Sequence, residues 1–217
     1  MGTITRNFAN NLTTSGLLKP DAFNNDSFDN VTAVPSGSVE TGDMQLISSA
    51  TASSSASIEF SLGNYKEYQF YFNNLDADDG TYIQFQASTD SGSTYATTIT
   101  SSAFRTQHNH ADTYTNLDYA TAYDQAQGTS FHYLTNTSGA TFTPERTHSG
   151  YMKLFNPSST TYVKHFISTI SSAASDDYMM TLDLGGYFNT TSALTNFKFQ
   201  ATSGNINSGQ ILLFGIN

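Results

Sequence analysis

Acidic side chains gather in one short stretch that the sequence indicates to be a turn. Asp76, Asp78 and Asp79 stand directly before Gly80, and Asp90 lies in the next turn of the chain. Carboxylate oxygens are the ligands that Ca²⁺ takes in proteins, but an EF-hand loop needs a later glycine and a glutamate at its twelfth position. The stretch therefore has two interpretations, a calcium site or a solvated turn at the tip of a hairpin. We favour the turn and predict no metal site.

The histidines give a weaker indication of metal binding. His108 and His110 are two residues apart, the spacing of two ligands on one face of a strand. The other three, His132, His148 and His165, are dispersed along the chain. Such a distribution is typical of histidines in loops and on sheet surfaces, and we predict no cofactor.

Four tyrosines between residues 104 and 133 are the candidates for binding. Tyr114, Tyr119, Tyr123 and Tyr133 could stack on a glycan or on a protein, because the ring is apolar and its hydroxyl is polar. The alternative is that these rings pack the stretch onto the body of the protein or onto a neighbouring subunit.

Catalytic motifs are missing from the sequence. It contains no Gly-x-Ser-x-Gly, no His-Glu-x-x-His, no phosphate-binding loop and no dinucleotide fingerprint. Glycoside hydrolysis needs a pair of carboxylates, and nothing in the spacing of the four glutamates indicates such a pair. The chain also has no tryptophan to hold a sugar. We therefore predict a protein that is not an enzyme and has no catalytic residues.

Composition excludes further classes of function. The formal net charge is −10 with only 8 Lys and Arg residues, so the chain lacks the basic surface that nucleic acids and anionic membranes require. It has no cysteine, no apolar run of membrane-spanning length and no apolar core of a signal peptide at its start. We expect neither nucleic acid nor a membrane as a partner.

Short alternating runs begin at residue 44 and are typical of half-buried strands. Aromatic residues make up 13% of the chain, which is enough apolar surface for a core despite only 12% charged residues. We predict an all-β fold, an antiparallel and jelly-roll-like β-sandwich over residues 44–217. The expected strands cover residues 44–47, 57–62, 67–73, 82–88, 95–100, 130–134, 150–155, 162–168, 178–187, 197–201 and 210–216.

Several connections can be predicted as well. Residues 104–128 are expected to form a long surface excursion, in which residues 119–127 could form a short helix. The pair Gly185-Gly186 is expected to form a bulge or bend. The last strand, 210–216, is so apolar that it should lie inside its sheet, because an exposed edge of that kind would aggregate.

Residues 1–43 follow neither the helical nor the strand period. Phe8, Phe23 and Phe28 occur singly among asparagines and prolines. The segment is either a disordered leader or an extended N-terminal arm that docks on another surface. We favour the arm, because a disordered leader has little use for three phenylalanines.

Five short motifs resemble a group of small proteins encoded by marine tailed bacteriophages, including those that infect cyanobacteria. These motifs, together with the opening residues 1–11 and the segment 28–31, span nearly the whole chain. They are Tyr65-Lys66-Glu67-Tyr68, Ser88-Thr89-Asp90-Ser91-Gly92, Phe155-Asn156-Pro157-Ser158-Ser159, Ser203-Gly204-Asn205-Ile206 and Leu213-Phe214-Gly215-Ile216. The resemblance implies a component of the virion, such as a tail fibre or capsid decoration protein. It implies no mapped binding site.

The function expected from these observations is that of a structural protein of the phage particle, made in the host cytoplasm. Its arm would anchor it to other virion proteins and its sandwich would assemble with further copies, with a trimer as the first expectation. The alternative is a protein at the tail tip that binds a host receptor or surface glycan. A polysaccharide-degrading enzyme is the least favoured class.

Deletion of residues 1–43 tests the arm. We expect the truncated chain to keep the circular dichroism spectrum of a β protein and to be absent from purified particles, because its anchor is missing. Immunoblots of particles grown with tagged full-length or truncated chain provide the measurement. Truncated chain found on particles at the full-length level would contradict an anchoring role.

Overall fold

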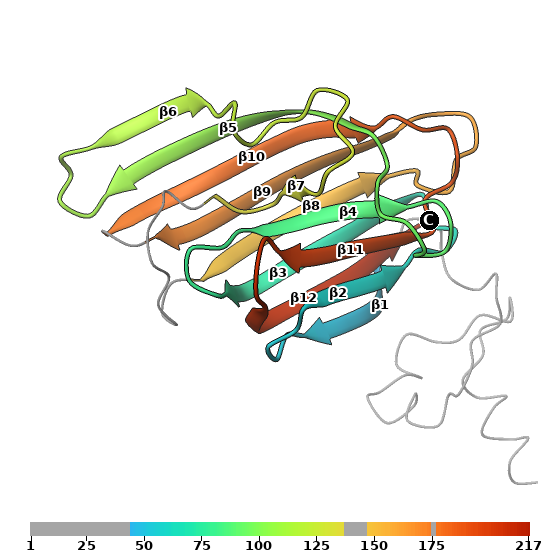
Figure 1. Ribbon diagram of the computed structural model, residues 1–217, viewed down its shortest axis with the longest axis horizontal. Helices are drawn as coiled ribbons and strands as arrows, with labels where there is room; N and C mark the ends of the chain where they lie inside the picture. The colour runs from blue at the N-terminus through green and yellow to red at the C-terminus, as the bar shows by residue number, and fades with distance from the viewer. Residues whose placement is uncertain (1–43, 137–146, 175–176) are drawn as a thin grey trace, which may run out of the picture. The chain divides into compact units, whose positions relative to one another are not determined.

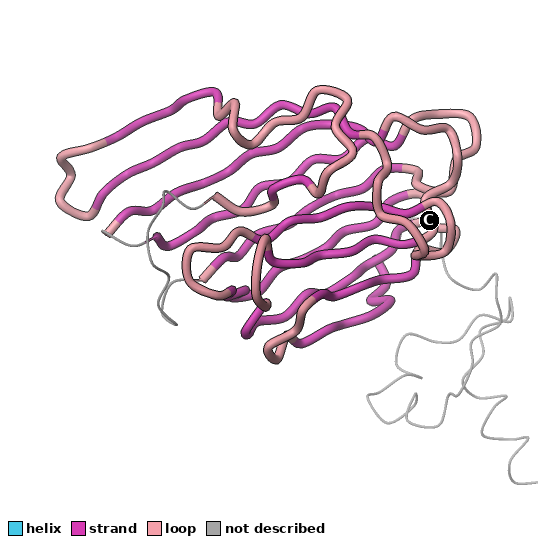
Figure 2. The backbone as a smooth tube through the Cα atoms, viewed as in Figure 1, coloured by secondary structure: helices cyan, strands magenta, loops and turns pink. Residues whose placement is uncertain are grey.

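The computed structural model describes residues 44–136, 147–174 and 177–217 (Figure 1). This part of the chain is all-β and contains no helix (Figure 2). It forms two antiparallel sheets that face each other, so the predicted β-sandwich is confirmed. Phe8, Phe23 and Phe28 lie outside the described residues, and the anchoring role and the boundary after residue 43 stay predictions.

Twelve strands make up the two sheets of the described chain. In chain order they are β1 (Met44–Thr51), β2 (Ser57–Ser61), β3 (Glu67–Ala77), β4 (Ile83–Ser88), β5 (Ile99–Asn109), β6 (Thr115–Tyr119), β7 (His132–Tyr133), β8 (His148–Phe155), β9 (Lys164–Ala174), β10 (Tyr178–Phe188), β11 (Asn196–Ala201) and β12 (Ile206–Ile216).

The two sheets differ in size. The larger has eight strands in the order β1-β12-β3-β8-β9-β10-β5-β6, and the smaller has four in the order β2-β11-β4-β7. Strand β12 pairs with β1 on one side and β3 on the other. The predicted interior position of this apolar strand is therefore confirmed.

Aromatic side chains from both sheets form the centre of the core. Alternate residues of β3 point to the same side, and Tyr68, Phe70 and Phe72 are all fully buried there. Phe197 and Phe199 reach them from β11 in the other sheet, with ring centroids 4.9 and 5.2 Å from that of Phe70. Burial of these rings between two sheets explains why the chain folds as a sandwich.

The structure corrects the prediction for residues 104–128. The first part of this span is the end of β5, and β6 returns beside it as a hairpin. The helix predicted over 119–127 does not form. Tyr123 is instead turned into a cluster with Tyr82 and Tyr133, and the N–H of Gln125 donates to Ser101 Oγ. Packing of the Tyr123 ring and the hydrogen bond from Gln125 to Ser101 of β5 outweigh the weak local preference for a helix.

A bulge or a bend is predicted at Gly185-Gly186, and the bulge is wrong. Strand β10 keeps an unbroken register with β5 and with β9 through both residues. A glycine is needed at position 186 for a different reason. A Cβ atom there would lie 2.6 Å from the Phe166 ring and 2.7 Å from the carbonyl oxygen of Thr100. The small residue thus allows the ring of Phe166 to cross the sheet surface.

Several predicted strand limits also change. Strand β3 extends to Ala77 and β12 begins at Ile206, and these two residues pair across the sheet. The carboxylate of Asp78 fastens this end by accepting hydrogen bonds from the Asn205 N–H and from Asn207 Nδ2. Residues 95–98 lie in a loop before β5, and the strand predicted over 130–134 is reduced to β7.

Replacing Phe70 by alanine should test the core. The ring contacts Phe60, Phe197 and Phe199, and its loss leaves a cavity between the sheets. We expect the free energy of unfolding to fall by about 3–5 kcal/mol and the melting temperature by roughly 10 °C. Thermal denaturation followed by circular dichroism measures both. Tyr162→Ala, at a side chain that is 67% exposed, is the matched control and should cost less than about 0.5 kcal/mol.

Candidate functional site

The side of the eight-stranded sheet that points away from the core carries a continuous band of side chains. Tyr71 lies between the inward-pointing Phe70 and Phe72 and therefore points outward. The strand register places one residue from each strand in line with it. In order across the sheet, this first row is Tyr119, Phe104, Asp183, Thr169, Tyr151, Tyr71, Leu212 and Ser49.

A second row runs beside the first, two residues along each strand. We call the two rows together the outer face. The second row consists of Ser102, Gly185, Ile167, Lys153, Gln69, Phe214 and Leu46.

The outer face mixes large apolar side chains with polar ones, and its single aspartate and single lysine carry opposite charges. Large apolar side chains remain exposed along it, including Ile167 at 43%. Its two ionisable groups of opposite sign are Asp183 and Lys153. Asp183 accepts a hydrogen bond of 2.7 Å from Thr169 Oγ1, and Lys153 Nζ lies 3.4 Å from the Glu67 carboxylate. In a chain of net charge −10, such a face can approach another protein surface without repulsion.

The structure divides the four candidate tyrosines into two pairs. Tyr119 lies at the end of the outer face, where its ring packs edge-on against Phe104 and its hydroxyl donates to Asp124. That hydrogen bond raises the pKa of Tyr119. Tyr114 is exposed in the loop before β6 and packs against Tyr178.

Tyr123 and Tyr133 pack against each other. Their ring centroids are 5.5 Å apart, and Tyr82 completes the cluster at 4.9 Å from Tyr133. Tyr123 is buried, which raises the pKa of its hydroxyl. The structure therefore does not bring the four candidate tyrosines together on one exposed surface.

The acidic residues of the predicted turn do not converge. Hydrogen bonds from Asn207 and Asn205 lower the pKa of Asp78, and hydrogen bonds from Ser88 and Thr94 lower that of Asp90. The Asp78 carboxylate thus joins the turn after β3 to the start of β12, and the Asp90 carboxylate stabilises its own turn. Within residues 44–136, 147–174 and 177–217, no group of three or more histidines or carboxylates is arranged to hold a metal ion.

The paired histidines of the hairpin also have separate partners. His108 Nε2 lies 3.1 Å from Asp112, and His110 Nδ1 lies 3.7 Å from Asp177, beside the turn that precedes β10. Both pairs are exposed to solvent at one end of the large sheet, and exposed ion pairs contribute little to stability.

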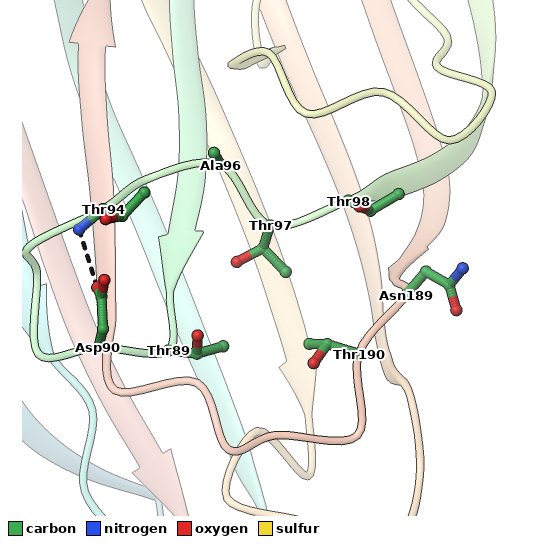
Figure 3. A pocket seen from close by; sticks show the side chains of 8 residues that line it. All are labelled: Thr89, Asp90, Thr94, Ala96, Thr97, Thr98, Asn189 and Thr190. Atoms are coloured by element: carbon green, nitrogen blue, oxygen red, sulfur yellow. Dashed lines mark hydrogen bonds between the residues drawn. The ribbon is translucent and has the colours of Figure 1, made fainter.

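A groove of about 350 Å³ opens between the loop before β5 and the loop after β10 (Figure 3). Hydroxyl and amide groups line it, and no lining residue is aromatic. It differs in this from the mostly apolar pockets that hold small molecules, but its hydroxyls could form hydrogen bonds with a polyhydroxylated ligand. Its lining is Thr89, Asp90, Thr94, Ala96, Thr97, Thr98, Asn189 and Thr190.

Two histidines that were assigned to loops or sheet surfaces are buried instead. His132 is stacked on Phe85, with Nε2 2.6 Å from Ser101 Oγ and Nδ1 2.7 Å from the Tyr133 carbonyl oxygen. His148 lies 2.7 Å from Ser172 Oγ. Burial lowers the pKa of each histidine to about 4. The alternation of His132 with Leu134, and of His148 with Met152, could have revealed their inward direction.

The Ser101–His132 pair has the arrangement of a nucleophile and a base, because the Tyr133 carbonyl can hold the proton on Nδ1. His132 is completely buried, however, so no substrate reaches it in this conformation. The N–H of Gln125 also donates to Ser101 Oγ. The pair therefore ties the segment before β7 to β5.

Comparison of the chain with models of protein families, with curated protein sequences and with solved structures gave no match. Among the described residues there is also no helix long and apolar enough to cross a membrane.

The two buried histidines predict how stability depends on pH. Between pH 6.5 and 4 the unfolded chain binds protons at His132 and His148 that the folded chain does not bind. The free energy of unfolding should therefore fall as the pH falls through this window, by about 3 kcal/mol for each histidine. Urea denaturation at a series of pH values measures the slope.

Each histidine can be tested separately. His132→Gln and His148→Gln should each remove about half of this slope, because each removes one of two similar shifts. A double variant that keeps the full slope would show that other groups control the acid sensitivity.

Proposed function

We propose that this chain is a structural protein of a bacteriophage particle, of the tail-fibre or capsid-decoration type, that assembles through its β-sandwich. The observation that carries the proposal is the outer face. It crosses the eight-stranded sheet, exposes Phe104, Tyr119, Tyr151 and Ile167, and carries no net charge. Several large exposed apolar side chains on one face of a protein are typical of an interface with another protein.

The physical argument concerns charge as much as apolar area. A net charge of −10 keeps free copies apart in solution. On the outer face Asp183 accepts a hydrogen bond from Thr169, and Lys153 is paired with Glu67 beside the second row, so its few charges have partners and the face is suited to close contact. Aromatic side chains are enriched at the centres of protein interfaces, and Tyr151 and Tyr71 lie side by side in the middle of the first row. The resemblance to virion proteins of marine tailed phages gives the assembly its setting.

Binding of a host-surface glycan is the second candidate function. The hydroxyl-lined groove between Thr97 and Thr190 favours it, because sugars are recognised through many hydrogen bonds. The exposed rings of Tyr114 and Tyr119 could add stacking. We rank it second, since the groove has no aromatic lining of its own.

Ile167→Lys tests the proposed function. The substitution places a charge in the middle of the outer face, where burial of an unpaired ammonium group is unfavourable. We expect incorporation of the variant into purified phage particles to fall about tenfold or more, while its melting temperature stays close to that of the unchanged protein. Quantitative immunoblots of particles grown with each form give the measurement.

Tyr162→Lys is the matched control, because Tyr162 is also a large exposed side chain but lies in the turn before β9, away from the outer face. It should enter particles normally. Equal incorporation of both variants would remove the outer face as the assembly surface. Normal incorporation of both variants, together with binding of the unchanged protein to host-surface glycans on an array, would favour the second candidate.

A further inference from the structure

Strand β6 ends the eight-stranded sheet, and one of its long sides faces no other strand of the described chain (Figure 1). Exposed edges are normally blunted by lysine, proline, a bulge or an inward-pointing charge. Residues 115–119 contain neither lysine nor proline, their register with β5 is unbroken, and the inward-pointing Asp118 is neutralised by Arg105. Leu117 on this strand is 71% exposed, the highest value among the large apolar side chains of the described residues.

Along this side, no other strand of residues 44–136, 147–174 and 177–217 pairs with the backbone of β6. At the two ends of the hairpin, the N–H of Ala120 donates to the Ala103 carbonyl and the N–H of Asn109 donates to the Tyr114 carbonyl. Alternate residues of an antiparallel strand bond to the same neighbour, so the even-numbered residues of β6 face β5. The groups that face the open side belong to three residues, Thr115, Leu117 and Tyr119.

We propose that β6 pairs antiparallel with β6 of a second copy of this chain, about a two-fold axis beside Leu117. Leu117 then lies opposite Leu117 of the partner subunit, and Thr115 lies opposite the partner's Tyr119. In this register, the outward N–H and C=O groups of all three residues are paired. The most exposed apolar side chain is covered by its own copy, which makes the contact self-complementary.

The charges of the strand fit this register. Asn116 of one copy lies opposite Asp118 of the other, so no carboxylate faces a carboxylate. Within each chain, Asp118 is already held by Arg105 at 2.9 Å and by Asn116 Nδ2 at 2.9 Å. The edge therefore adds no charge repulsion to the approach of two acidic chains.

The other three edges of the described sheets fit self-pairing less well. In β2 the N–H of Leu62 donates to Thr195, which leaves the groups of Glu59 on the open side. Pairing centred there would set Glu59 opposite itself. Strand β1 has a register shift after Leu46, and β7 contains only two residues.

This pairing rests on the proposed function in treating the chain as one that assembles, and it names the contact between copies. The two-fold axis is perpendicular to the paired sheets, so the outer faces of both copies point to the same side. Two copies would then offer their outer faces side by side to one partner surface.

Light scattering and sedimentation of the full chain test the pairing. We expect a particle of twice the chain mass of 23.6 kDa. Leu117→Lys would place like charges opposite each other and should raise the dissociation constant of the dimer at least about tenfold. Tyr162→Lys, the same introduced side chain at an exposed position away from both β6 and the outer face, should leave the dimer intact. Circular dichroism checks that both variants are folded.

Disulfide trapping tests the register, because the chain contains no cysteine of its own. In the proposed pair the Cα atoms at position 117 are about 5.5 Å apart, which is a distance that a disulfide can bridge. Leu117→Cys should therefore form a covalent dimer on mild oxidation. Thr115→Cys is the matched control on the same edge, since its two copies would be about 14 Å apart and should not cross-link.

Each outcome decides the pairing. A monomer, a trimer, or a dimer in which Leu117→Cys fails to cross-link would overturn it, as would cross-linking at position 115 in place of 117. A cross-linked dimer that is absent from phage particles would leave the pairing in place and remove the proposed function. A monomer that is incorporated into particles would overturn the pairing and leave the proposed function in place.

Discussion

Contact between the phenylalanines of two facing sheets is the constraint on which the rest of this structure depends. Phe70 of β3 touches Phe197 and Phe199 of β11, and Phe85 of β4 reaches Phe166 of β9. Because side chains alternate along a strand, turning these rings inward determines which residues point outward on every strand in register with them. The outer face is therefore a consequence of the core, and its composition is free to serve an interface.

The unequal size of the sheets has its own consequence. Four strands cannot cover the inner side of eight, and β5 and β6 lie at one end of the larger sheet. Their inward positions are accordingly polar, with Arg105 bonded to Asp118 and Gln107 close to Met180. The same end keeps apolar side chains on its outward positions. This reversal of the usual pattern sets the hairpin apart from the core strands and gives β6 both an open backbone edge and an exposed leucine.

A face without net charge, together with the proposed self-pairing of the β6 edge, would allow several copies of the chain to assemble. Copies joined at β6 would present a doubled outer face, as expected of a protein that covers or extends a larger particle. The remaining surface carries the acidic charge of the chain and keeps unpaired copies soluble. The hydroxyl-lined groove lies between loops at the ends of the strands, where it would be compatible with this assembly (Figure 3).

The sequence by itself determined the fold class, the position of most strands and the interior place of the last one. Those features depend on the alternation of apolar and polar residues along each strand, and this alternation is visible in the sequence. Only the tertiary structure decided where strands end, which histidines are buried and which tyrosines are exposed. Residues 119–127 form no helix because the Tyr123 ring packs against Tyr82 and Tyr133, and Tyr82 lies far from it in the sequence. The outer face was beyond prediction for the same physical reason, since its rows are set by pairing between strands far apart in sequence.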